Sequence, residues 1–405
     1  MSLTTPSSVQ KLQRALHAKA KEAPKFRFYA LYDKVYRRDV LAHAYERCEA
    51  NGGAAGVDDQ TFEDIEQYGA ERWLDELTQE LKSRTYQPKP VRRVYIPKPD
   101  GKQRPLGIPT IRDRVVQTAA GLVLEPIFEA DLPPEQNAYR ADHSALDAVQ
   151  DVHKLINTGH KQIVDADLSS YFDSVPHAEL MKSVARRVVD GAMLHLIKMW
   201  LEAPVEATDE HGNTRRSTRN RDEGRGTPQG SPISPLLGNL YMRRFVLGWK
   251  RLGHEKRWKA YIINYADDLV ICCRAGAVQA LAAMRTMMSR LKLTVNENKT
   301  RVLPSAEGEV RLSGVHVRAM LLDAKGPNLS RYDPFEETSA ARLSRHQRRN
   351  RARYHRTNSA EHGGKAQSNS DRLGQLLLSG SGQQSLQCGR CPHPPQAASV
   401  ALRQV

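Results

Sequence analysis

Two adjacent acidic residues, Asp267 and Asp268, lie between two apolar segments, residues 261–263 and 269–273. This pattern predicts two strands joined by a tight turn. Neighbouring carboxylates in such a place repel each other and lose solvation unless a cation compensates them. Taken alone, an Asp-Asp pair is most often a solvated turn, so a metal site needs a further ligand from elsewhere in the chain.

A third acid, Asp167, lies near the end of another short apolar segment, residues 162–168. Three carboxylates from two strands suit Mg²⁺, which takes oxygen ligands and leaves room for substrate phosphates. Two such ions about 3.5–4 Å apart stabilise the attacking and leaving oxygens of an in-line phosphoryl transfer. We therefore expect Asp167, Asp267 and Asp268 to bind two Mg²⁺ ions.

A basic stretch, residues 92–106, could bind a triphosphate. Lys98 and Arg104 flank a Pro-Asp-Gly turn, and in a hairpin both side chains can reach one anion. The alternative is an ordinary solvated basic hairpin. Further basic residues could contact a nucleic acid backbone: Arg92, Arg93, Lys102, Arg112, Arg114 and Lys299.

Residues 226–235 form a segment with two glycines and three prolines, which predicts an extended turn, and an apolar helix is expected over residues 236–247. Glycine permits close backbone approach, and the Gln229 side chain both donates and accepts hydrogen bonds. The segment could therefore line a nucleotide. The alternative is a surface loop before a helix.

The elements that would position these residues alternate between helix and strand, which predicts a mixed α/β fold. Hydrophobic periodicity predicts helices over residues 8–21, 38–50, 71–83, 115–128 and 278–291. Strands are expected over residues 91–96 and 162–168 and, around the Asp-Asp turn, within residues 260–273.

The composition favours a nucleic acid partner. The chain has 405 residues and a formal net charge of +15, so a polyanion is expected, with nucleic acid first and an anionic membrane second. No run of 18 apolar residues is present, which excludes a membrane-spanning helix, and the N-terminus has no secretory pattern. We expect nucleic acid, and not a membrane, as the partner. Five cysteines indicate reduced thiols in a cytoplasmic protein.

Eight stretches, taken in chain order over about residues 27–301, resemble the reverse transcriptase family, and specifically the bacterial group II intron-encoded reverse transcriptase/maturase. They are Gly56–Asp58, the run from Ile96 to Pro109, Asp113–Gln117, Tyr139-Arg140 with Ser144-Ala145, the run from Asp165 to Asp173, Thr227–Pro232, Tyr265–Asp268 and Asn296–Thr300. Each match is weak alone, and the order makes the set specific.

The resemblance implies an α/β (α+β) right-hand polymerase fold with fingers and palm. Residues 1–60 would form an N-terminal extension and the start of the fingers, and residues 61–301 the fingers and palm. The implied activity is RNA-directed DNA polymerase, a nucleotidyltransferase of a mobile intron. A primer 3′-hydroxyl attacks the α-phosphate of a deoxynucleoside triphosphate and releases pyrophosphate. The implied partners are an intron RNA template, a DNA primer or target, and dNTPs.

The resemblance also implies roles for single residues. Asp167, Asp267 and Asp268 match the metal-binding triad, with the Leu168 carbonyl as an extra ligand. Lys98 and Arg104 match the residues that bind the triphosphate. Phe172 matches the steric gate that excludes a ribose 2′-hydroxyl, and Gln229 matches a residue beside the nascent base pair. The Asp173 side chain is expected to be structural.

Residues 302–405 depart from the family, which continues with a helical thumb and a maturase domain. They contain no Ile and no Trp, and 13 Arg and 2 Lys against 8 acids give them a charge of +7. We expect a basic tail without a core, and a thumb that is absent or scrambled. On this view Cys388 and Cys391 are not a metal site, because two thiols supply half of a zinc site.

A changed reading frame could explain this departure. Codons can be chosen for Val310–His316 that, one base forward, read Phe-Asp-Phe-Leu-Gly-Tyr, and for Leu373–Leu378 that read Trp-Ala-Asn-Tyr-Phe. Both products are signatures of the family. The hypothesis is that residues from about 302 are an out-of-frame product, and different codons in the gene would exclude it.

Three functions remain open from the sequence. The chain is an RNA-directed DNA polymerase that also binds its intron RNA, a non-catalytic RNA-binding splicing cofactor, or a truncated inactive relic. A reverse transcriptase of a diversity-generating or CRISPR-associated element is a further alternative of the same class. The intact aspartates argue against the splicing cofactor as the only role, and the tail argues for the relic.

Overall fold

The computed structural model describes residues 4–97, 101, 103–208, 213–304, 309–312 and 315–318. The description that follows covers these residues. Lys98, Lys102, Cys388 and Cys391 lie outside them.

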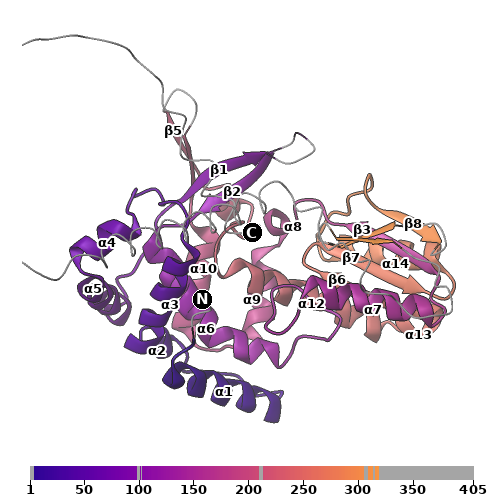
Figure 1. Cartoon of the computed structure of the whole chain (residues 1–405), viewed down its shortest axis with the longest axis horizontal. Helices are drawn as coiled ribbons and strands as arrows, with labels where there is room; N and C mark the ends of the chain where they lie inside the picture. The colour runs from indigo at the N-terminus through magenta and orange to yellow at the C-terminus, as the bar shows by residue number, and fades with distance from the viewer. Residues whose placement is uncertain are drawn as a thin grey trace, which may run out of the picture. The chain divides into compact units, whose positions relative to one another are not determined.

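A four-stranded antiparallel sheet with the order β6-β7-β3-β8, here called the central sheet, holds the acidic residues (Figure 1). Its strands come from distant parts of the chain: β3 (Gln162–Asp167), β6 (Ala260–Tyr265), β7 (Asp268–Cys273) and β8 (Arg301–Pro304). Because β7 pairs with both β6 and β3, the sheet places the end of β3 beside the turn between β6 and β7.

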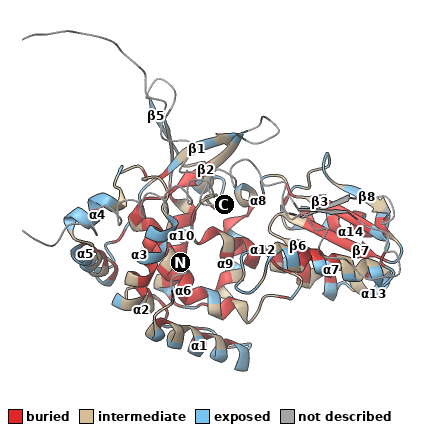
Figure 2. Cartoon of the chain, in the orientation of Figure 1, coloured by how far each residue is buried: buried red, intermediate tan, exposed pale blue. Residues whose placement is uncertain are grey.

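Side chains alternate between the two faces of the central sheet, as the period of two in a strand requires. Ile163, Val270 and Cys272 share a small core with α7 (Ala145–Asn157). Val164, Ile271 and Cys273 belong to the main core, together with Met284 and Met288 of α14 (Ala277–Arg290). The sheet is therefore covered by helices on both faces, and its interior is buried (Figure 2).

A second sheet with the order β2-β1-β4-β5, here called the hairpin sheet, holds the basic stretch. Strands β1 (Val91–Pro97) and β2 (Gln103–Ile108) form an antiparallel hairpin. Strand β4 (Val205–Thr208) is parallel to β1 and antiparallel to β5 (Thr214–Ser217). The pair β4 and β5 was not anticipated from the sequence.

Helix α6 (Ile111–Glu129) is the centre of the main core, and its first residues are as buried as its middle. It contacts α1 (Ser7–Glu22), α2 (Tyr32–Val35), α3 (Arg38–Asn51) and α12 (Ser234–Arg251). The hydroxyl of Thr110 caps the helix by accepting a hydrogen bond from the Asp113 amide. The first fifty residues therefore share one core with the residues that follow.

The helices and strands expected from periodicity are confirmed, with ends that differ by a few residues. The remaining elements are α4 (Phe62–Tyr68), α5 (Ala70–Ser83), α8 (Tyr171–Ser174), α9 (His177–Ala185), α10 (Gly191–Glu202), α11 (Arg219–Asp222), α13 (His254–Trp258), β9 (Glu309–Leu312) and β10 (Val315–Arg318).

Strand β8 crosses the boundary expected between residues 301 and 302, because Val302 and Leu303 pair with Val164 and Ile163 of β3. Strands β9 and β10 then form a separate antiparallel hairpin. Among the described residues, no helix is both long and apolar enough to cross a bilayer.

Candidate active site

The acidic turn is a two-residue connection between β6 and β7. Tyr265 pairs with Asp268 at the end of the ladder, and Ala266 adopts a left-handed conformation with φ 56°. The Asn264 side chain donates hydrogen bonds to the carbonyls of Ala266 (2.9 Å) and Asp268 (3.0 Å). Such donors compensate the carbonyls of a tight turn. The turn therefore places Asp267 and Asp268 at the end of the strands, at one end of the sheet.

Asp167 lies beside this turn because β3 pairs with β7. Its Cα is the ladder partner of the Asp268 Cα, and Ala166 pairs with Leu269. The backbone positions of the three acids therefore lie at the same end of the central sheet.

A short segment after α14 encloses the Asp167 carboxylate. The Asn296 side chain donates to Asp167 Oδ2 at 2.7 Å, and the Lys299 ammonium lies 3.3 Å from the same oxygen. The Asn296 amide also donates to the Asp167 carbonyl at 2.9 Å. Residue Leu168, whose side chain is buried, forms a bridge with Val295. The role of the Leu168 carbonyl as a ligand remains a prediction.

Burial raises the pKa of Asp267, and the charge of Asp167 raises it further. The charges of Arg104 and Lys299 act in the opposite direction. A partly buried carboxyl beside a second carboxylate is the arrangement that a bound cation stabilises. The electrostatics of the turn therefore fit a cation site.

Across the described ranges, no three His, Cys, Asp or Glu side chains converge closely enough to hold a metal ion. Asp167 instead contacts Asn296 and Lys299. The available donors are carboxylate oxygens, which are the ligands that Mg²⁺ prefers. The residues present fit Mg²⁺ by their chemistry, and metal binding itself remains a prediction.

Arg104 and Lys299 are basic residues whose charges act on the acidic turn. Arg104 lies on β2 opposite Ile96, and its charge lowers the pKa of Asp267 against the larger effect of burial. An arginine in this place can bind a phosphate next to the carboxylates. Lys98, the other residue expected to bind a triphosphate, lies outside the described residues.

Phe172, the expected steric gate, is fixed against helix α12. A Cβ added to Gly238 would lie 3.1 Å from the Phe172 ring and 3.4 Å from the Tyr171 ring, so the helix and the two rings are in close contact. The ring of Tyr139 meets Phe172 at 6.4 Å between centroids, with an interplanar angle of 63°. Tyr139 has φ 56°, a rare conformation for a residue with a side chain. No role was assigned to Tyr139 from the sequence.

The segment that contains Gln229 packs against β2. The Gln229 carbonyl accepts a hydrogen bond from the Gly107 amide at 2.6 Å. Gly230 has φ +110°, and a Cβ there would lie 2.5 Å from the Gly107 carbonyl oxygen. Glycine is therefore required at position 230, and the segment lies against the strand that holds Arg104.

The arginines expected to contact nucleic acid divide into two groups. Arg92 is exposed on β1 and forms an ion pair with Asp59 at 2.8 Å, and Arg93, on the same strand, opposes the effect of burial on the pKa of Asp173. Contacts of Arg92 and Arg93 with a nucleic acid backbone remain a prediction. Lys102 lies outside the described residues.

Arg112 and Arg114 are both held by contacts within the protein. Arg114 is 2% exposed and donates to the carbonyls of Gly52 (3.0 Å) and Ala54 (3.1 Å). Arg112 forms an ion pair with Glu80 and lies over the Trp73 ring, 5.4 Å from its centre. The expectation for Arg114 was wrong, because the start of α6 is buried. Arg112 is held against α5.

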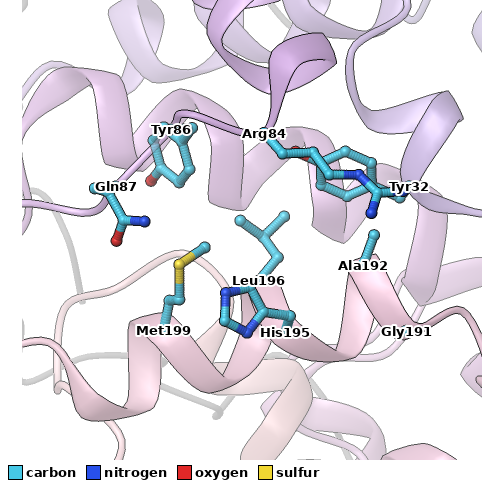
Figure 3. Close-up of a pocket in the computed structure, with 9 residues that line it drawn as sticks. All are labelled: Tyr32, Arg84, Tyr86, Gln87, Gly191, Ala192, His195, Leu196 and Met199. Atoms are coloured by element: carbon cyan, nitrogen blue, oxygen red, sulfur yellow. The ribbon is translucent and has the colours of Figure 1, made fainter.

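A cavity of about 170 Å³ lies away from this site. Tyr86, Gln87 and Arg84 line one side of it, and α10 lines the other with His195 and Met199 (Figure 3). None of the expected site residues lines this cavity. The candidate active site is therefore defined by the acidic turn and not by the cavity.

A family model described as "Reverse transcriptase (RNA-dependent DNA polymerase)" matches residues 96–317. The matched residues include the acidic turn, Asp167, Arg104, Phe172 and Gln229. The chain belongs to the reverse transcriptase family. The α/β reverse transcriptase fold expected from the sequence is confirmed. The match also extends beyond residue 302, and the reading-frame hypothesis stays a prediction.

Named relatives agree with the resemblance to group II intron proteins. Group II intron-encoded protein LtrA of Lactococcus lactis subsp. cremoris is 32% identical over 229 residues, which cover 55% of this chain and 36% of that protein. The putative COX1/OXI3 intron 1 protein of Saccharomyces cerevisiae is 30% identical over 332 residues, which cover 69% of this chain and 38% of that protein. The chain thus spans little more than a third of the length of these two relatives.

Two further similarities differ in strength. Protein YkfC of Escherichia coli (strain K12) is 32% identical over 331 residues, which cover 73% of this chain and 84% of that protein. The solved "Partial Cas6-RT-Cas1--Cas2 complex" matches with a TM-score of 0.37 and 22% identity over 64% of this chain and 41% of that chain. The second similarity is too low to support an inference about function.

Proposed function

We propose that the chain is the RNA-directed DNA polymerase of a group II intron. It transfers deoxynucleotides to a primer 3′-hydroxyl with two Mg²⁺ ions, and it binds its intron RNA for splicing and retrohoming in the cytoplasm. The observation that supports this most strongly is the pairing of Asp167 with Asp268, next to Asp267 in the turn. Three carboxylates at one sheet end, beside Arg104, suit phosphoryl transfer.

Each residue of the site has a defined task in this reaction. Asp167, Asp267 and Asp268 hold the metal, which neutralises charge on the reacting phosphate when bound. Arg104 binds the phosphates of the incoming nucleotide, together with Lys98. These contacts align the α-phosphate with the primer hydroxyl, and such positioning lowers the barrier of a bimolecular reaction.

The sugar and the base are bound by the neighbouring elements. The Phe172 ring packs against Tyr139 and Gly238. In the proposed reaction this ring is the wall that excludes a 2′-hydroxyl. The segment at Gln229 lies against β2 and faces the nascent base pair. Arg92 and Arg93 on β1 contact the template backbone, and this contribution weakens as salt rises.

Primer extension on an RNA template tests the proposal. The purified full chain, with Mg²⁺ and dNTPs, is expected to lengthen an annealed primer, and ribonucleoside triphosphates are expected to be poor substrates. Absence of synthesis, together with specific binding of the intron RNA, would favour a non-catalytic splicing cofactor. Absence of both would favour a relic.

A non-catalytic splicing cofactor is the second candidate, because one relative is named as a nuclear intron maturase. The genetic context separates a group II intron from a diversity-generating or CRISPR-associated element. Finding a ribozyme domain V hairpin downstream of the gene would support the assignment to a group II intron.

A further inference from the structure

The turn that follows α14 binds Asp167 through two groups that differ in exposure. Asn296 is partly buried and contacts Asp167 through its side chain (2.7 Å) and its backbone amide (2.9 Å). The Lys299 side chain is 62% exposed and contacts only the carboxylate, at 3.3 Å. Backbone hydrogen bonds from Lys299 (3.1 Å) and Thr300 (3.0 Å) to the Asn296 carbonyl close the turn. Asn296 is therefore held to β3 by two hydrogen bonds, whereas the Lys299 side chain is held by one exposed ion pair.

The Lys299 ammonium compensates an acid that has acidic neighbours. It lies 3.3 Å from Asp167 Oδ2, and the strand register places Asp167 beside Asp268, next to Asp267 in the turn. One exposed lysine therefore helps to compensate the repulsion among carboxylates at one end of the sheet.

We propose that Lys299 is a displaceable counter-ion of the acidic site, which competes with the divalent metal for Asp167, while Asn296 keeps the carboxylate oriented. The inference rests on the proposed function, because it assumes that Asp167 is a metal ligand. A metal can bind Asp167 Oδ2 fully only when the ammonium moves into solvent, which its exposure permits. Lys299 is thus a positioning residue that sets the affinity for metal.

Mn²⁺ binding to the full chain tests this, because Mn²⁺ takes the same oxygen ligands and free Mn²⁺ is measured directly by electron paramagnetic resonance. Lys299→Met is expected to tighten the apparent Kd by about two- to five-fold, the size expected for removal of one largely exposed ion pair. Lys292→Met is the matched control: Lys292 is 60% exposed and lies 2.9 Å from Glu179, outside the acidic site. Its Kd should equal that of the wild type.

A second arm needs no metal. In EDTA, Lys299→Met should lower the melting temperature, because the carboxylates lose a counter-ion. Asp167→Asn in the same chain should recover part of that loss, since it removes one of the repelling charges. An unchanged melting temperature for Lys299→Met, or no recovery in the double variant, would overturn the counter-ion role.

The outcomes separate this inference from the proposed function. If Asp267→Asn abolishes Mn²⁺ binding but Lys299→Met binds Mn²⁺ as the wild type does, the metal site stands and the competition is refuted. If the wild type binds no Mn²⁺, or Asp267→Asn binds it unchanged, the acidic turn is not the metal site. Both the proposed function and this inference then fail.

Discussion

Asp167 and Asp268 are ladder partners in the adjacent antiparallel strands β3 and β7. The register of these two strands therefore determines whether the acidic residues lie at the same end of the sheet. A slip of one residue would turn Asp167 to the opposite face of the sheet. The same slip would move Ile163 and Val164 between the two cores that they separately fill. The apolar packing of the strand interiors therefore fixes the geometry of the acidic site.

Phe172→Ala is expected to admit ribonucleotides. The substitution removes the ring that packs on Gly238 and Tyr139, and so opens space beside the sugar. The measurement is the ratio of deoxynucleotide to ribonucleotide incorporation in primer extension. Incorporation of dNTPs by the same variant is the internal control, and an unchanged ratio would mean that Phe172 is not the gate.

Gly230→Ala is expected to destabilise the fold and to impair synthesis. The residue needs φ +110°, and the new Cβ would lie 2.5 Å from the Gly107 carbonyl oxygen. Gly52→Ala is the matched control, because Gly52 has φ +65° and nothing lies within 4 Å of its added Cβ. The control, whose backbone has φ 65° and ψ −143°, should lose about 1–3 kcal/mol of unfolding free energy through conformation alone.

Urea unfolding of both variants measures the difference. Gly230→Ala should lose clearly more stability than Gly52→Ala. Equal losses would show that the contact between the Gln229 segment and β2 is not tight.

Asp113 is expected to make stability depend on pH. Burial raises the pKa of Asp113 to about 6, although Tyr86, Thr110 and the Lys89 amide donate hydrogen bonds to its carboxylate. The folded state then binds more protons than the unfolded state between about pH 4 and 6. The contribution of Asp113 is therefore present below about pH 4 and is lost as the pH rises to 6, by about 3 kcal/mol.

Asp113→Asn provides the test of this dependence. The variant loses hydrogen bonds at every pH, but the difference in unfolding free energy between wild type and variant should shrink from pH 4 to pH 6. A difference that stays constant over this range would contradict the raised pKa.

Removal of residues after Arg318 is expected to leave the melting temperature nearly unchanged. The removed segment has no Ile and no Trp, and ordering each residue costs about 1–2 kcal/mol. A cut after Thr300 is the informative comparison, because it deletes β8 from its pairing with β3. That shorter chain should melt at a lower temperature. The folded part of the chain therefore extends past residue 301, where the sequence analysis placed its end.

RNA binding should respond to the same cut after Arg318. Since the removed segment is basic, its loss should flatten the dependence of RNA affinity on salt.

The melting curves also test the segment itself. A cooperative loss of stability on the cut after Arg318 would show that the segment is a folded domain.

Local sequence patterns predicted the long helices and the strands that carry the site, but helices such as α7, α9 and α10 were not anticipated. The apolar strands around Asp267, the amphipathic helices and the apolar run of α6 all have strong periodicity, and each formed as expected. The pair β4 and β5 escaped prediction because both strands are only four residues long, and β5 is fully exposed. Such strands form only because β1 offers them an edge.

Pairings between distant residues could not be predicted in the same way. Lys299 was expected at a nucleic acid backbone, which stays a prediction, and its contact with Asp167 after the return of the chain from α14 was not indicated by the sequence. Arg114 has the charge of a phosphate ligand, but the helix around it is buried on all sides. The apolar run from Val115 onwards was the available signal of that burial.

DNA synthesis by Asp267→Asn tests the central claim most directly. The full chain and the variant are compared on the same RNA template and primer, with RNA binding measured in parallel. We predict that the variant loses synthesis almost completely and keeps nearly normal RNA affinity, because the asparagine preserves the turn but removes an anionic ligand. Extension by the variant at close to the wild-type rate would contradict the assignment of the acidic turn as the catalytic site.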